Sequence, residues 1–124
     1  MPENLKEIET ILRAILVKHC PPLRVRIDTP ANFEVAGTKP CMQGKQKVEG
    51  IYYASVVPKP KDVRFYFFPN YTHTTSFANQ YPAMQMCLKG KSCFHIKALT
   101  PEMENELVEM VRHGVHLYQK QGWL

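Results

Sequence analysis

A short cationic segment in the second half of the chain has the residue types needed to bind an anion. Lys89, Gly90, Lys91 and Ser92 follow one another directly. Two ammonium groups, a hydroxyl group and the main-chain N–H groups beside glycine can converge on a phosphate or carboxylate. The spacing differs from that of a nucleotide-binding P-loop. The alternative is a structural turn whose glycine permits a positive φ angle, with both lysines in solvent.

Acidic and histidine side chains recur near the C-terminus at spacings that bring them together on a helix. Glu109 and His113 are four residues apart, and His113 and His116 are three apart. Such a group can hold a divalent metal. The other interpretation is charge matched to the helix dipole, with acids early in the helix and Lys120 late. We favour that interpretation and expect no cofactor and no tight metal site.

Aromatic residues concentrate in the strand-like segments and directly after them. Tyr53, Tyr66, Tyr71 and His73 can line a pocket there, although aromatic side chains on strands more often belong to a core. No nucleophile motif and no Ser–His–Asp or Cys–His grouping can be assembled, and His95 has no visible partner. We therefore assign no catalytic residue and expect a binding or carrier domain. An enzyme that uses the sheet face is an alternative.

Length and charge limit the class of protein further. The 124 residues are 44% hydrophobic, which predicts a single domain over residues 1–124. The net charge of +5 suits a small anionic ligand or a protein partner, but also a plain lysine-rich surface. Nucleic acid is not expected, because the ring of Phe94 beside the basic segment should point inward.

The cellular setting follows from what the sequence lacks. No apolar run is long enough to span a membrane, and the N-terminus shows no signal pattern. The four scattered cysteines form no Cys-x-x-Cys pair and are expected to be free thiols. We therefore expect a cytoplasmic location.

The periodicity of apolar residues predicts the elements that position these side chains. Residues 4–19 and a segment that begins after Thr100 repeat with the helical period, and a further short helix is expected near residues 75–86. Alternation of apolar and polar residues, together with aromatic and β-branched residues, predicts strands at residues 23–28, 32–36, 51–57, 63–68 and 92–97. Residues 37–50 are expected to form a loop or loose hairpin. Gly114 interrupts the apolar stripe of the last helix, so we expect the helix to approach the sheet closely there. The predicted fold is α+β, with an antiparallel sheet and both terminal helices on one face.

With these elements in place, the chain resembles the YdhG-like family from about Leu5 to Trp123. The resemblance is carried by residues 51–57 (IYYASVV), 65–69 (FYFFP) and 89–97 (KGKSCFHIK), and by the spacing of Gly114, Tyr118, Gly122 and Trp123. It implies a small cytosolic domain of unsettled activity whose fold is similar to that of frataxin. One branch is described as a frataxin-like iron chaperone, which makes iron delivery another alternative.

Overall fold

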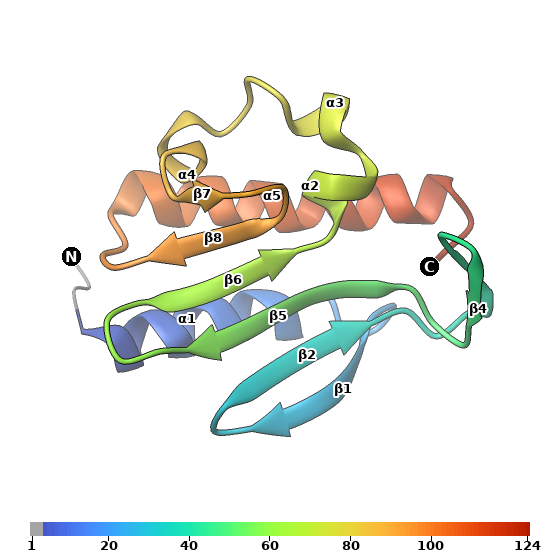
Figure 1. Ribbon diagram of the computed structural model, residues 1–124, viewed down its shortest axis with the longest axis horizontal. Coiled ribbons are helices and arrows are strands. Elements are labelled where there is room, and N and C mark those ends of the chain that lie inside the picture. Colours follow the sequence, from blue (N-terminus) through green and yellow to red (C-terminus); the bar gives the residue numbers. More distant parts are fainter. Residues whose placement is uncertain (1–3) are drawn as a thin grey trace.

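Two long helices cover one face of an antiparallel sheet in the computed structural model, which describes residues 4–124 (Figure 1). The six-stranded sheet has the order β1-β2-β5-β6-β8-β7. These strands are β1 (Arg24–Thr29), β2 (Asn32–Ala36), β5 (Tyr52–Pro58), β6 (Val63–Phe67), β7 (Leu88–Lys89) and β8 (Cys93–Ile96). The α+β prediction and the shared face of the helices are confirmed. In the described part of the chain, no helix is both long and apolar enough to cross a bilayer.

Both long helices begin at side-chain caps that the sequence provides. The helix α1 spans Leu5–Val17, and the Asn4 side chain accepts a hydrogen bond of 2.8 Å from the Lys6 N–H. The helix α5 spans Pro101–Lys120, and the Thr100 hydroxyl accepts one of 3.1 Å from the Met103 N–H. These caps satisfy N–H groups that have no partner within the helix. They explain why the boundaries predicted from sequence lie close to the observed ones.

The middle of α5 packs directly against the sheet at Gly114. A Cβ atom at this position would lie 2.5 Å from the hydroxyl oxygen of Tyr53, 2.9 Å from Cζ of Phe67 and 3.0 Å from Cγ of Pro69. Real Cβ atoms essentially never approach other atoms as closely as the first two distances. The glycine is therefore required by the close approach of helix and sheet, as the interrupted stripe predicts.

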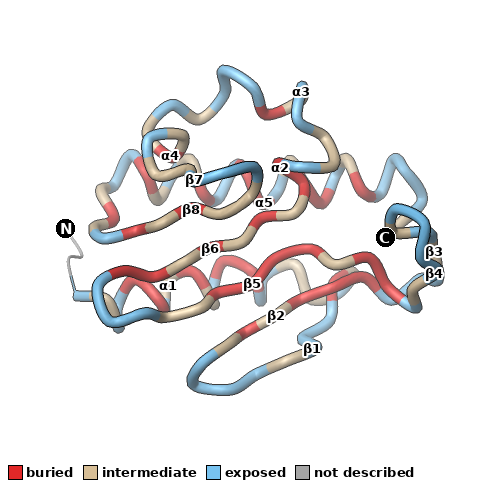
Figure 2. The backbone as a smooth tube through the Cα atoms, viewed as in Figure 1, coloured by how far each residue is buried: buried red, intermediate tan, exposed pale blue. Residues whose placement is uncertain are grey.

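Alternation along β6 separates the core from the open face of the sheet. The side chains of Val63, Phe65 and Phe67 are buried, whereas Arg64 and Tyr66 between them are only half-buried. Figure 2 shows the buried stretches along β5 and β6, in front of the two long helices. The open face, turned toward the viewer in Figure 1, carries neither long helix.

The segment between β6 and β7 differs from the prediction of one short helix near residues 75–86. It forms three helices of four residues each, α2 (Pro69–Thr72), α3 (Thr74–Phe77) and α4 (Pro82–Gln85). Asn79 and Tyr81 have positive φ angles of 62° and 54°, which a continuous helix does not allow. The prediction of a single helix was therefore wrong.

Two short pairings complete the structure. Residues 37–50 contain the hairpin of β3 (Cys41–Gln43) and β4 (Gln46–Val48), in agreement with the loose hairpin predicted there. The strand β7 was not predicted as a separate element. It pairs with β8 through Leu88 with Phe94 and Lys89 with Cys93, so residues 90–92 form the connecting turn.

Candidate functional site

The cationic segment 89–92 includes the turn that connects β7 with β8. Gly90 has a φ angle of +77°, which supports the structural interpretation of this glycine. The turn backbone is tied to its neighbours. The carbonyl of Lys91 accepts a hydrogen bond of 2.7 Å from the Asn70 side chain, and the carbonyl of Ser92 accepts one of 2.8 Å from the Phe67 N–H.

The two lysines of this segment line different cavities. Lys91 lies over the ring of Tyr71, with Nζ 5.5 Å from the ring centroid, and lines a cavity of about 350 Å³ with Asn70 and Thr74. Lys89 lines a separate cavity of about 590 Å³. The turn thus places Lys89 at one cavity, and Gly90 and Lys91 at the other.

The larger cavity lies between the β7–β8 edge of the sheet and the start of α5, and we call it the edge cavity. Most of its lining is apolar, from Ala83, Met86, Cys87, Ala98 and Met103. Its polar side chains are Lys89, His95, Lys97, Thr100 and Glu102. Cavities that hold small molecules have this size and this combination of apolar walls and few polar groups.

Charge in the edge cavity is mainly positive. Lys89 and Lys97 are exposed at the cavity, and Glu102 in the first turn of α5 is its one acid. The methionine Met86 is 86% exposed although it is apolar, so it offers a contact surface to a ligand. An organic anion with an apolar group could contact the lysine ammonium groups with its charged part and the apolar wall with the rest.

His95, which had no visible partner in the sequence, has one in the structure. Its Nδ1 atom lies 3.5 Å from Oδ2 of Asp62, and the other carboxylate oxygen of Asp62 lies 3.4 Å from Nε of Arg64. Arg64 and His95 are register partners on β6 and β8, whereas Asp62 comes from the β5–β6 connection. The sequence could not show this contact, because it depends on the pairing of two strands about thirty residues apart.

The cysteine of the edge cavity is not prepared for nucleophilic chemistry. Burial raises the pKa of the Cys87 thiol above its ordinary value, so the thiol is protonated at neutral pH. The pKa of Cys93 on the open face is also raised, mainly by burial. Cys87 is therefore best described as part of the apolar wall.

The four residues predicted to line an aromatic pocket do not lie together. Tyr53 is 0% exposed and belongs to the core under α5, so its assignment to a pocket was wrong. Tyr66 lies on the open face of β6, whereas Tyr71 lines the smaller cavity beside Lys91. The ring of His73 contacts Tyr118 and Trp123 instead. Tyr53 packs against α5, whereas Tyr66 points to the opposite face. Regular alternation would place Tyr53 on the face of Tyr66, but the register of β2 with β5 shifts beside it, since Val35 pairs with Ala54 and Ala36 with Tyr52.

The acidic and histidine residues of α5 make separate contacts. Glu109 pairs with Arg112, and Nδ1 of His113 lies 3.1 Å from the hydroxyl group of Tyr81. His116 is exposed. Among residues 4–124, no group of three or more His, Cys, Asp or Glu side chains is arranged to hold a metal ion. The structure thus does not bring Glu109, His113 and His116 together as a ligand set.

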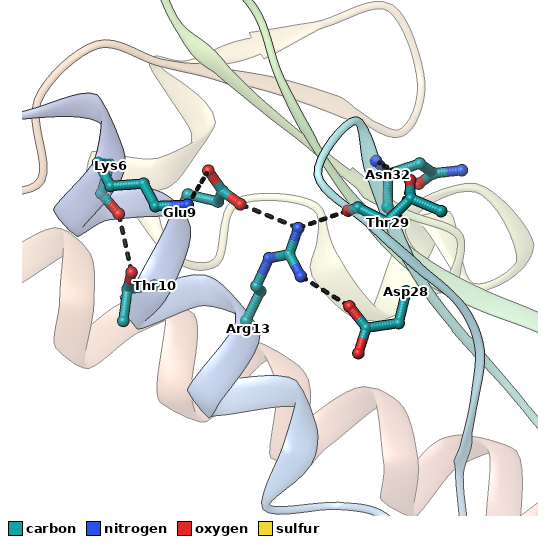
Figure 3. Close-up of polar contacts among 7 residues, drawn as sticks. All are labelled: Lys6, Glu9, Thr10, Arg13, Asp28, Thr29 and Asn32. Carbon is teal, nitrogen blue, oxygen red and sulfur yellow. Dashed lines mark hydrogen bonds and ion pairs between the residues drawn. The ribbon is translucent and has the colours of Figure 1, made fainter.

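A polar cluster around Arg13 was not predicted. Figure 3 shows its guanidinium group between Glu9 of α1 and the β1 residues Asp28 and Thr29. Its nitrogen atoms lie 2.9 Å from Oε2 of Glu9, 3.0 Å from Oδ1 of Asp28 and 2.9 Å from the carbonyl oxygen of Thr29. The Arg13 side chain also lies over the ring of Phe33. A cavity of about 330 Å³ adjoins this cluster, but the charged groups already pair with one another. The cluster joins α1 to the β1–β2 hairpin, and the four-residue spacing of Glu9 and Arg13 was its only sequence signal.

Comparison with known proteins finds no matching family model, no matching curated protein and no matching solved structure.

Proposed function

We propose that the protein is a binding domain for a small organic anion that also has an apolar part. The observation that carries the proposal is the edge cavity, where Lys89 and Lys97 lie at a mostly apolar wall. Ammonium groups bind carboxylate and phosphate oxygens through charge-assisted hydrogen bonds. Apolar contact adds about 25 cal/mol for each Å² removed from water, which favours an organic anion over an inorganic one.

The assignment to the YdhG-like family and a cytoplasmic location are parts of the same proposal. The family assignment is supported by the motif at residues 89–97, which supplies Lys89, His95 and Lys97 to the edge cavity. The location is supported by the four cysteines, which are free thiols. An architecture with two helices against an antiparallel sheet agrees with the resemblance. The iron-chaperone alternative has less support, because Glu9 of α1 pairs with Lys6 and Arg13 and is buried.

The test is an NMR titration of the labelled protein with phenyl phosphate, inorganic phosphate and phenol. We expect saturable shifts of the amides at residues 87–89 and 95–100 with phenyl phosphate, and much weaker effects with either fragment alone. Substitution Lys97→Gln should weaken phenyl phosphate binding about threefold to tenfold, the range of one partly solvated charge contact. Lys45→Gln, on the exposed β3–β4 turn, is the matched control and should leave binding unchanged.

Two results would contradict this proposal. One is a titration in which no amide around the edge cavity shifts with any of the three compounds. The other is equal binding by wild-type protein and Lys97→Gln, which would show that the cavity charge does not select the ligand.

A further inference from the structure

His95 stands between a buried carboxylate and the edge cavity. The Asp62 residue is 7% exposed and contacts Nδ1 of the imidazole at 3.5 Å. Because Nδ1 faces Asp62, Nε2 is the ring nitrogen left for a ligand in the cavity that His95 lines. The backbone fixes this arrangement, since the His95 N–H donates to the Cys87 carbonyl at 2.9 Å and the Lys59 N–H donates to the Asp62 carbonyl at 2.9 Å.

The protonation state of this imidazole decides what an anion meets. With a proton on Nδ1 only, Nε2 presents a lone pair that repels an anionic oxygen. With both nitrogens protonated, Nε2–H becomes a charged donor to the ligand, while Nδ1–H keeps its contact with the carboxylate. Asp62 therefore acts as a positioning residue, because it orients the ring and stabilises the imidazolium form.

Charged side chains from several elements surround His95. The cations that face this region are Arg64, Lys89 and Lys97, and the acids are Asp62 and Glu102. Cys87 is a neutral thiol, because burial raises its pKa. An anion bound in the cavity would add negative charge beside the imidazole, which favours its protonated form.

We propose that the edge cavity selects an organic dianion and that His95, held by Asp62, takes up a proton when this ligand binds. The inference rests on the proposed function and names its ligand class more closely. A protonated His95 together with Lys89 and Lys97 gives three cationic groups against the single acid Glu102 of the cavity lining. That balance matches two negative charges better than one.

The experiment is calorimetric titration with meta-benzenedisulfonate, whose two charges do not titrate near neutral pH. Any proton taken up must then come from the buffer to the protein. Binding heats measured in Tris and in bis-tris, which differ in ionisation enthalpy, should differ by an amount that corresponds to uptake of a substantial fraction of one proton. Benzenesulfonate, with one charge, should bind about tenfold more weakly, the loss of one good charge contact.

Substitutions assign the proton to the pair. We expect His95→Gln and Asp62→Asn each to abolish the buffer dependence of the heat while weakened binding remains measurable. His116 is exposed, so the matched control His116→Gln should leave both the affinity and the buffer dependence of the heat unchanged. Two independent variants guard against a folding defect in one of them, which the amide spectrum would reveal.

The outcomes separate this inference from the proposed function. Disulfonate binding that depends on Lys97 but releases the same heat in both buffers would overturn proton uptake and leave the anion site in place. Persistent buffer dependence in Asp62→Asn would overturn the role given to Asp62. Failure of both the disulfonate and phenyl phosphate to bind would overturn both proposals.

Discussion

The hydroxyl group of Tyr53 donates a hydrogen bond of 2.6 Å to the main-chain carbonyl of Val111 and joins β5 to α5. Burial raises the pKa of this phenol well above its ordinary value, so it remains a donor throughout the neutral range. The ring lies edge-on to Phe67 and to Tyr118. Tyr53, which the sequence suggested as a pocket residue, is instead a fully buried member of the core.

Substitution Gly114→Ala should destabilise the protein although alanine favours helices. The new Cβ would meet the Tyr53 hydroxyl, Phe67 and Pro69 at 3.0 Å or less. Overpacking of this kind costs about 1–3 kcal/mol, whereas the gain in helix propensity is about 1 kcal/mol at most. We expect a lower urea midpoint for Gly114→Ala. The exposed position Gln119→Ala, on the same helix, should change the midpoint little, and an increase for Gly114→Ala would contradict the close packing described here.

Acidification should destabilise the folded protein through its partly buried histidines. Burial lowers the pKa of His113, with Arg112 as a second cause, and burial also lowers the pKa values of His73 and His19. The unfolded chain then binds more protons than the folded one below about pH 6.5, so the free energy of unfolding falls as pH falls through that value. Denaturant unfolding at several pH values between about 7.5 and 5.5 measures this slope.

The variant His113→Gln tests the assignment. It removes one of the groups with a lowered pKa, so the fall in stability between neutral and mildly acidic pH should be shallower than in the wild type. His116→Gln is the control because His116 is exposed on the same helix. A slope unchanged in His113→Gln, or changed equally in both variants, would argue against His113 as a source of the pH dependence.

Glu106 should hold the wall of the edge cavity without touching a ligand. Its carboxylate accepts hydrogen bonds from the main-chain N–H groups of Ala83 and Met84, at 3.2 and 2.9 Å, and so joins α4 to α5. In Glu106→Ala we expect the free energy of local opening at residues 82–87 to fall by about 1–2 kcal/mol. Amide hydrogen exchange there should be correspondingly faster. Phenyl phosphate binding should weaken as well. Glu104→Ala, two residues away, should do neither.

Helices, strands and their buried faces could be predicted from the sequence, because they depend on residues close together in the chain. The apolar stripe of α5, its start after Thr100 and the inward side chain of Phe94 follow from periodicity and capping. The segment between β6 and β7 could not be predicted in the same way. Its turns depend on positive φ angles at Asn79 and Tyr81, which residue type alone does not reveal.

The candidate site was only partly predictable for a related reason. Lys89 and Lys97 were recognised as cationic, but their common cavity depends on how α4, the β7–β8 hairpin and the start of α5 pack against one another within residues 83–103. The Asp62 partner of His95 depends on the register of β6 with β8. Sequence patterns identify which side chains share a face, whereas contacts between neighbouring strands require the register itself.

Zinc and ferrous iron should bind weakly at most. The charge of Glu109 is paired with Arg112, which also holds the pKa of that carboxyl below its usual range. His113 faces Tyr81 and the ring of Phe77 rather than an open ligand set. Calorimetric titration should show no site tighter than about micromolar, as expected for isolated ligands without a geometric set. A stoichiometric site that disappears in the His113→Ala, His116→Ala double variant would restore the iron-chaperone alternative.

The two lysines beside Gly90 should differ in their effect on ligand binding. Lys89 lines the edge cavity with His95 and Lys97, whereas the ammonium group of Lys91 lies over the ring of Tyr71 and lines the smaller cavity. Lys89→Ala should therefore weaken phenyl phosphate binding about threefold to tenfold at low salt, and Lys91→Ala should have little effect. Both variants lose one positive charge from the same hairpin, so a general loss of electrostatic attraction would affect them equally. Raising the salt concentration should reduce the difference, because screening weakens the contact that Lys89 makes. If Lys91→Ala weakens binding as much as Lys89→Ala, the anion is recognised by the turn as a whole and the edge cavity is not the site.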